Sequence, residues 1–247
     1  MGCVPNMARR KLSIVAPAYN EEKKVKNTFL RLTSFFSNKG YELEYVFVED
    51  GSKDRTRAVL DEIAKGRSDV RVLLNERNMG KGYTIKKGML AASGDHILFI
   101  DVDMSTPLSA FSDFEEYLDD YDIVMGSRWL EESNIRIPQP RLRRMFAIIF
   151  YIIVKTFFLK GIIDTNCGFK CYKRAVAREI FSKQRLNSWG FDVENLYIAQ
   201  KRGYRIKEVP VIWAHGRDSK VDLLRVPLAT LIELIEIKIN DWKGRYE

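Results

Sequence analysis

In the stretch HILFIDVDMSTP, residues 96–107, an apolar run ends directly in acidic residues. Residues 97–100 are branched or aromatic, which is typical of a strand buried on both faces of a parallel sheet. Asp101 and Asp103 follow at once. Side chains two apart in extended backbone point to the same side, so both carboxylates can face one hard cation, Mg²⁺ or Mn²⁺. We therefore predict a metal-binding pair at the carboxyl end of a buried strand.

The spacing of two aspartates around one residue is weak evidence alone. Asp120 and Asp122 have it too, at the start of a later strand-like run. The alternative for Asp101 and Asp103 is a solvent-exposed turn with no ligand. The position of the pair, and not its spacing, favours the metal site.

Outward from this stretch, short apolar runs alternate with helical patterns. Strands are predicted over 12–16, 45–48, 70–74, 97–100 and 123–126, and helices over 21–38, 54–65, 80–92 and 107–119. The alternation predicts an α/β fold, a mainly parallel Rossmann-like sheet with helices on both faces. Beyond it we expect a helix around 191–203, a strand over 204–213 and a C-terminal amphipathic helix.

A polar loop follows each predicted strand. The loops read PAYNEE (17–22), EDGSKDRT (49–56), NERNMGKG (75–82), DVD (101–103) and GSR (126–128). In such sheets ligands bind at the carboxyl ends of the strands. Gly80 and Gly82 permit close backbone approach and Lys81 supplies charge, while Glu49 and Asp50 suit a base or ribose. The loops predict a site for a polar, phosphorylated ligand.

Charge and apolar patterning point to a membrane surface. The chain of 247 residues has a formal charge of +8, which implies an anionic partner. Arg136, Arg141, Arg143 and Arg144 precede an apolar run at 145–159. As a helix this run is about 22 Å long, shorter than a hydrocarbon core of about 30 Å. It predicts peripheral membrane contact in place of nucleic-acid binding, and a buried helix remains the alternative.

The C-terminal segment has a helical apolar stripe. Its members are Leu228, Leu231, Ile235, Ile239 and Trp242. We expect this stripe to pack on the core, with membrane contact as the alternative. The three cysteines form no disulfide framework, and no secretory signal is evident, which favours a cytoplasmic location.

Eight motifs in order carry a resemblance. They are APAYNEE, VEDGSKDRT, RNMGKGYTIKKGM, FIDVDMSTP, GSRW, DTNCGFKCYKR, WGFDVENLYIA and EVPVIW with DSKV. The set resembles the inverting GT-A glycosyltransferases of family 2 that act on polyprenyl phosphate, namely dolichyl-phosphate glucosyltransferases and dolichyl-phosphate mannose synthases. DTNCGFK and GFDVE are more similar to the glucosyl branch. The resemblance spans residues 11–221, so we expect an extension at 1–10, a donor half at 11–130, an acceptor half at 131–221 and a terminal helix at 222–247.

The resemblance implies a role for each matching residue. The nucleotide-sugar donor would contact Pro17, Tyr19, Glu21, Glu49, Asp50, Lys81, Asp101, Asp103 and Arg128. The metal, Mg²⁺ or Mn²⁺, would bind Asp101 and Asp103. The acceptor phosphate would contact Arg141, Arg217, Ser219 and Lys220. Catalysis would rest on Asp103, Arg128, Arg141 and Arg217. Glu49 stands where the family has Asp, and Ser105 stands where mannose synthases have a metal-facing Gln.

The implied reaction is transfer of a hexose to a lipid phosphate with inversion, at the cytoplasmic face of a membrane. Glucose from UDP-glucose onto polyprenyl or dolichyl phosphate is favoured, giving a β-linked lipid phosphosugar for protein glycosylation. The alternatives are GDP-mannose as donor, or a saccharide acceptor with Asp192 or Glu194 as general base. A non-catalytic nucleotide- or membrane-binding protein is the rival of a different class.

Overall fold

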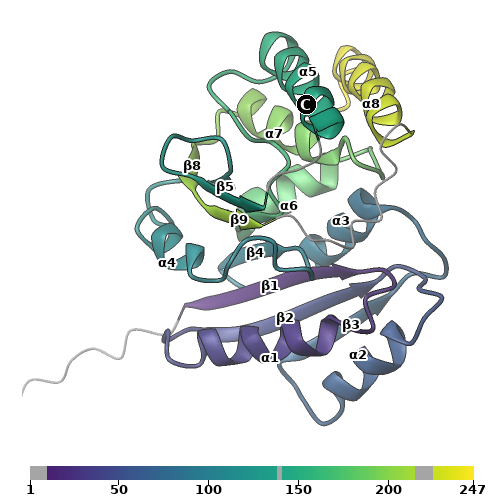
Figure 1. Cartoon of the computed structure of the whole chain (residues 1–247), viewed down its shortest axis with the longest axis vertical. Helices are drawn as coiled ribbons and strands as arrows, with labels where there is room; N and C mark the ends of the chain where they lie inside the picture. Colours follow the sequence, from purple (N-terminus) through teal and green to yellow (C-terminus); the bar gives the residue numbers. More distant parts are fainter. Residues whose placement is uncertain (1–9, 138–140, 215–224) are drawn as a thin grey trace, which may run out of the picture.

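A seven-stranded sheet forms the centre of the molecule, in the order β3-β2-β1-β4-β7-β5-β8 (Figure 1). The computed structural model describes residues 10–137, 141–214 and 225–247, with side chains outside 135–147 and 225–228. The strands are β1 (Lys11–Ala18), β2 (Glu42–Glu49), β3 (Val70–Leu74), β4 (His96–Ile100), β5 (Ile123–Ser127), β7 (Phe169–Lys173) and β8 (Ile206–Pro210). Only β7 runs antiparallel to its neighbours. The predicted mainly parallel α/β sheet is confirmed.

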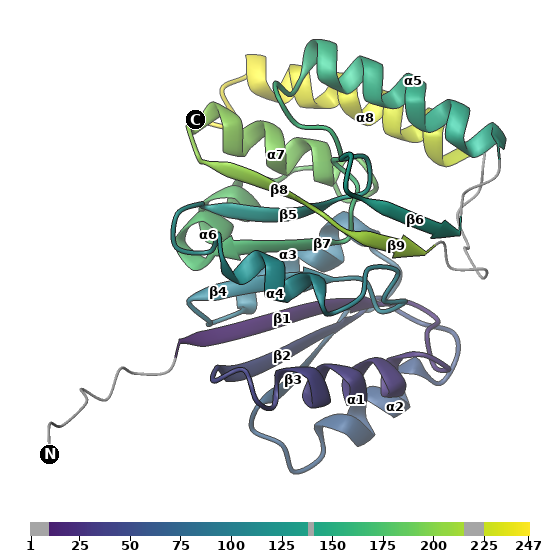
Figure 2. The same cartoon turned by 60° about the vertical axis from the view of Figure 1, so that its left-hand side comes forward.

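Helices cover both faces of this sheet. On one face lie α1 (Val25–Phe36), α2 (Thr56–Ala64) and α4 (Ala110–Glu115), and on the other α3 (Lys81–Ala91), α6 (Arg174–Lys183) and α7 (Phe191–Lys201). The alternation within β1 separates the two cores, because Ile14 and Ala16 pack under α1 while Val15 packs under α3. Helices α5 (Arg141–Phe157) and α8 (Arg225–Trp242) lie side by side beyond α7 (Figure 2).

Two predicted elements differ clearly from the structure. The helix expected over 107–119 shrinks to α4, because its first turn closes with i→i+3 bonds such as Ala110 N to Pro107 O. The strand expected over 204–213 ends its pairing with β5 at Pro210, which has no N–H to donate. The chain then forms β9 (Ile212–Ala214), which pairs with β6 (Asn134–Ile137) in a second sheet.

In the C-terminal helix Leu231 packs against the core as predicted, but the predicted orientation is wrong for three other residues of the stripe. Ile235 and Ile239 are 62% and 44% exposed, and Trp242 is 88% exposed. The buried face instead carries Leu234 and Ile237. This face also contains Thr230 and Asn240, so the apolar pattern of the sequence is stronger on the side that faces away from the core.

Helix α5 exposes apolar residues as well. Together the two helices expose eight large apolar side chains, here called the α5–α8 face: Ile148, Ile149, Ile152, Phe157, Ile232, Ile235, Ile239 and Trp242. Within the described ranges, no helix combines the length and the hydropathy needed to cross a bilayer.

Candidate functional site

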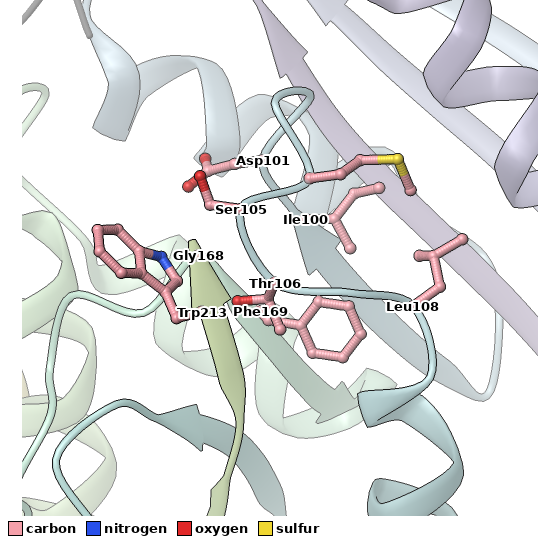
Figure 3. Close-up of a pocket in the computed structure, with 9 residues that line it drawn as sticks. Ile100, Asp101, Ser105, Thr106, Leu108, Gly168, Phe169 and Trp213 are labelled. Atoms are coloured by element: carbon pink, nitrogen blue, oxygen red, sulfur yellow. The ribbon is translucent and has the colours of Figure 1, made fainter. Parts of the chain in front are cut away.

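The strand order places a crevice between β1 and β4. In the sheet, β2 and then β3 lie on one side of β1, and β4 lies on its other side, so the order of the strands reverses between β1 and β4. Ligands of open α/β sheets bind at such a reversal. On the β7 side of β4 lies a pocket formed by the end of β4, the loop after it, the start of β7, and β9; its lining residues are Ile100, Asp101, Met104, Ser105, Thr106, Leu108, Gly168, Phe169 and Trp213. In Figure 3 Trp213 lies on one side and Leu108 on the other, with the Asp101 and Ser105 oxygens between them.

The loops after β1 and β2 are joined by hydrogen bonds. Asn20 N donates to Ser52 Oγ at 3.0 Å, Lys53 N donates to Asn20 Oδ1 at 2.7 Å, and Glu21 N donates to Thr56 Oγ1 at 2.7 Å. The Glu21 carboxylate forms an ion pair with Lys24 at 3.2 Å. Pro17 and Tyr19, beside this junction, are half-buried. The predicted nucleoside residues therefore belong to one built rim, and their contact with a donor remains a prediction.

Asp50 holds the loop after β3. Its buried carboxylate accepts hydrogen bonds from Asn75 Nδ2 at 2.8 Å, Met79 N at 2.8 Å and Gly80 N at 3.2 Å. Glu49 is also buried and accepts from Ser52 N at 2.5 Å. Both side chains thus support the rim, and the donor contact that the resemblance implied for them stays a prediction.

Gly80 should not tolerate a side chain. Its φ is 96°, and a Cβ would lie 2.4 Å from the carbonyl oxygen of Asn187. Gly66 has a similar φ of 72° but faces open space. We expect Gly80→Ala to lower the free energy of unfolding by about 3 kcal/mol or more, and Gly66→Ala by about 1–2 kcal/mol. Urea denaturation measures both, and equal losses would contradict the close packing at Gly80.

Asp101 and Asp103 lie in a turn and not in extended backbone. β4 ends at Ile100, and Met104 N donates to Asp101 O at 3.0 Å with Met104 at a φ of 50°. Asp103 is exposed and accepts from Ser105 N at 3.0 Å. The argument from strand alternation was therefore wrong, although both carboxylates do belong to one tight turn at the crevice.

Lys81 pairs with Asp101. The Nζ of Lys81 lies 2.8 Å from Asp101 Oδ1, and it lies 5.7 Å and 5.4 Å from the ring centres of Phe99 and Trp189. Burial by itself would lower the pKa of Lys81, but the Asp101, Asp192 and Asp103 carboxylates outweigh it and raise that pKa. The ammonium group is therefore charged and held against the turn that contains Asp101 and Asp103, here called the acidic turn.

The acidic turn fits a divalent cation. Two carboxylates match a hard ion that completes its shell with phosphate and water. Gly168 makes room for one of them, because a Cβ there would lie 1.9 Å from Asp101 Oδ2. Among the residues the structure describes, no group of three or more His, Cys, Asp or Glu side chains is arranged to hold a metal. A cation at this turn would thus take its remaining ligands from elsewhere.

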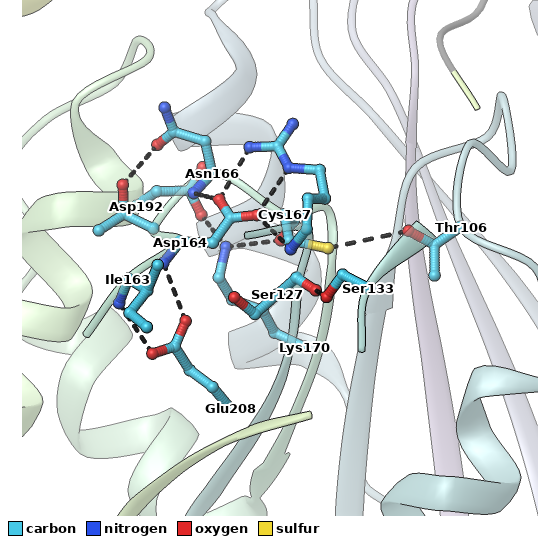
Figure 4. A network of polar contacts seen from close by, with 12 residues as sticks. Thr106, Ser127, Ser133, Ile163, Asp164, Asn166, Cys167, Lys170, Asp192 and Glu208 are labelled. Atoms are coloured by element: carbon cyan, nitrogen blue, oxygen red, sulfur yellow. Dashed lines mark hydrogen bonds and ion pairs between the residues drawn. The ribbon is translucent and has the colours of Figure 1, made fainter. Parts of the chain in front are cut away.

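Arg128 forms a buried ion pair with Asp164, which is labelled in Figure 4. Its Nε and Nη2 donate to the two Asp164 oxygens at 2.6 Å and 2.8 Å, and its backbone N donates at 2.9 Å. The guanidinium lies 5.2 Å from the ring centre of Trp213, which lines the pocket. Burial would lower the pKa of Arg128, yet Asp164 raises it. Arg128 thus lies behind the pocket wall, and its predicted contact with the diphosphate stays a prediction.

Asp192 and Glu194, the two carboxylates considered as a general base, both already interact with other groups of the protein. Asp192 forms an ion pair with the buried Lys170, which also donates to Cys167 O at 2.8 Å. Glu194 is fully buried and accepts from Leu186 N at 2.9 Å and from the Tyr246 hydroxyl at 2.6 Å. Glu194 is therefore structural, which contradicts a role as general base for a saccharide acceptor.

The predicted acceptor residues Arg217, Ser219 and Lys220 lie outside the described residues. Arg141 begins α5, and its side chain is not described. Conversely, sequence reasoning assigned no role to Asp164, Gly168, Lys170 or Trp213, although all four stand inside motifs quoted above. For Asp164 and Lys170 the available signal was a charged residue beside apolar ones, since a buried charge needs a partner.

Comparison with known proteins identifies the family. The family model described as Glycosyl transferase family 2 matches residues 13–181. The chain belongs to this family. The predicted family membership is thereby confirmed, and the protein is a glycosyltransferase.

Named relatives extend the similarity over most of the chain. Dolichyl-phosphate beta-glucosyltransferase of Dictyostelium discoideum is 33% identical over 242 residues, which cover 93% of this chain and 74% of that protein. The Homo sapiens protein of the same name is 33% identical over 226 residues, covering 86% and 70%. A solved structure of glucosyl-3-phosphoglycerate synthase from Mycobacterium tuberculosis with Mn²⁺, UDP and glucosyl-3-phosphoglycerate superposes with a TM-score of 0.68 at 21% identity, covering 92% of this chain and 80% of that one. The last comparison supports the fold.

Proposed function

We propose that this glycosyltransferase moves glucose from UDP-glucose onto dolichyl phosphate, giving a β-linked lipid phosphosugar. The observation that carries the proposal is the acidic turn with Lys81 at the sheet crevice, in a chain similar over 93% of its length to a dolichyl-phosphate beta-glucosyltransferase. The relative crystallised with Mn²⁺ and UDP has the same fold.

The acceptor brings its own nucleophile. The second pKa of a phosphate monoester is near 6, so at neutral pH the acceptor oxygen is largely anionic without a general base. That oxygen forms a bond to the anomeric carbon while the bond from this carbon to the UDP oxygen breaks, and the electron pair leaves with UDP. This chemistry suits a site where Glu194 is buried and Asp192 is paired with Lys170.

The protein residues would act by position and charge. Asp101 and Asp103 would hold Mg²⁺ or Mn²⁺, which neutralises charge that develops on the departing diphosphate. Lys81 would contact the donor phosphates, and the rim of Pro17, Tyr19 and Glu21 would contact the nucleoside. Arg141, Arg217, Ser219 and Lys220 would hold the acceptor phosphate, so that two anions are kept in line.

We propose the cytoplasmic surface of a membrane as the partner of the α5–α8 face. Exposed Phe157 and Trp242 are side chains that favour the boundary between headgroups and acyl chains. The proposed substrate is a lipid, and the basic residues Arg141, Arg143 and Arg144 belong to the first turn of α5. Docking by this face would present the lipid phosphate to the acceptor side of the enzyme.

The double variant Ile235→Ser/Trp242→Ser should bind lipid vesicles at least about tenfold more weakly, because each buried apolar side chain contributes about 1.5–3 kcal/mol. Sedimentation with phosphatidylcholine–phosphatidylserine vesicles measures the loss. Leu30→Ser is the matched control, since Leu30 is 56% exposed on α1 at the opposite end of the molecule (Figure 1). Equal binding by the double variant and the wild type would count against this face.

The donor is tested by thermal unfolding with UDP-glucose, GDP-mannose or neither, each with and without Mn²⁺. A ligand that binds the folded state raises the melting temperature according to its occupancy. We expect UDP-glucose with Mn²⁺ to give the largest rise. A larger rise with GDP-mannose would replace the proposed donor with the mannosyl alternative.

A further inference from the structure

The Lys81 ammonium group contacts the Asp101 carboxylate oxygen that a bound metal ion would need. It lies 2.8 Å from Asp101 Oδ1, a contact distance between charged groups. The rings of Phe99 and Trp189, 5.7 Å and 5.4 Å away, favour a cation in this position. The other Asp101 oxygen packs against Gly168. The carboxylate is thus enclosed by a positive charge on one side and backbone on the other.

A second cation at this turn meets repulsion. Three carboxylates, Asp101, Asp103 and Asp192, act on Lys81. Lys170 pairs with Asp192, so Lys170 and Lys81 together supply two positive charges against these three negative ones. The group of five side chains therefore carries one net negative charge. A divalent ion placed on Asp101 would share that oxygen with an ammonium group a few ångströms away. Like charges at such a separation repel strongly in a partly buried site.

The backbone around Lys81 does not easily move. Gly80 N donates a hydrogen bond to the Asp50 carboxylate, and Tyr83 N donates one to Asn187 O at 3.1 Å. A Cβ on Gly82 would lie 2.8 Å from Phe191 Cβ, so the start of α3 is tightly packed. The four-carbon side chain of Lys81 can still change rotamer. The ammonium group can therefore leave Asp101 without a change of fold.

We propose that Lys81 is a placeholder cation, which holds Asp101 in the free enzyme and transfers to the donor diphosphate when donor and metal bind together. The inference rests on the proposed function for the nature of the donor, since a diphosphate is the anion that would draw Lys81 away. Lys81 is thereby a positioning residue that couples the two ligands. The free enzyme should bind the metal weakly, and UDP should strengthen that binding.

The coupling is reciprocal. If UDP raises the affinity for the metal by some factor, the metal raises the affinity for UDP by the same factor. Removing the ammonium group should raise metal affinity in the absence of UDP and should shrink this factor toward one. A lysine that merely stabilised the Asp101 turn would give the opposite result, because its loss would weaken metal binding.

The test is titration of the intact chain with Mn²⁺, with free Mn²⁺ measured by electron paramagnetic resonance, in the presence and absence of UDP. The variants are Lys81→Met, Lys81→Arg and the control Lys65→Met, which removes an exposed lysine at the end of α2. No acceptor lipid is present. Failure of glucosyl transfer to dolichyl phosphate therefore leaves this test unaffected.

For the wild type and Lys65→Met, we expect UDP to raise Mn²⁺ affinity by about tenfold or more. Lys81→Met should bind Mn²⁺ about tenfold more tightly than wild type without UDP, and UDP should raise that affinity by a smaller factor than in wild type. Lys81→Arg should keep most of the coupling. The inference is overturned if UDP leaves the Mn²⁺ affinity of the wild type unchanged, and this result does not depend on any variant. It is also overturned if Lys81→Met binds Mn²⁺ no more tightly than the wild type. Circular dichroism melts verify that each variant is folded.

Discussion

Asp103→Ala should reduce glucosyl transfer by about 1,000-fold or more, because the metal that we propose for the acidic turn would supply several kcal/mol of charge stabilisation to the departing diphosphate. Asp103 is exposed and accepts a hydrogen bond from Ser105 N within its own turn. The free energy of unfolding should therefore change by about 1 kcal/mol or less. Initial rates at saturating donor, with a chemical denaturation curve, measure the two effects separately.

The matched control is Asp120→Ala. Asp120 is exposed and has the same spacing to Asp122 that Asp101 has to Asp103, but it precedes β5 at the opposite rim of the sheet. This variant should keep the wild-type rate. If Asp103→Ala retained more than about a tenth of the wild-type rate, the metal role of the turn would be wrong.

Arg128→Met should destabilise the fold by about 3–5 kcal/mol, because it leaves the Asp164 carboxylate buried without its partner. For a chain of this size the melting temperature should fall by about 10 °C. Arg10→Met is the control, since Arg10 also bonds both Asp119 oxygens but the pair is exposed. Its loss should cost about 1 kcal/mol or less.

The loss in Arg128→Met should depend on pH in a stated direction. Burial would raise the pKa of Asp164, yet Arg128 holds it below its usual value in the native enzyme. The pair therefore stabilises the wild type above the pKa of an unfolded aspartate, and this contribution fades as pH falls through the lower folded value. Without Arg128 the buried carboxyl pKa rises, so the difference in melting temperature should shrink between pH 7.5 and pH 5. A difference that grew toward pH 5 would contradict the pairing.

The parallel strands could be predicted because each is a short apolar run ended by polar residues. β3, expected over 70–74, has those bounds in the structure. The antiparallel β7 was missed because its sequence, FKCYK, has Lys170 at a buried position, where the ion pair with the distant Asp192 makes its charge tolerable. The α8 orientation was missed for the related reason that polar Thr230 and Asn240 share its buried face.

The site shows the same division between local and distant information. Strand ends located Asp101, Lys81 and Arg128 on neighbouring loops of one sheet edge. Their partners came from elsewhere in the chain: Lys81 pairs with Asp101 across the crevice, and Arg128 pairs with Asp164 after α5. The local sequence pattern does not predict such ion pairs, because they form only when separate segments of the chain pack together and are buried.

Incubation of the enzyme with UDP-glucose, dolichyl phosphate and Mn²⁺ tests the central claim most directly, with the lipid product analysed by mass spectrometry and nuclear magnetic resonance. The account predicts glucosyl phosphodolichol with a β linkage, formed in equal amount to the UDP released, and neither product when dolichyl phosphate is replaced by an oligosaccharide. An α-linked product, or UDP released at the same rate without any lipid phosphate, would contradict it.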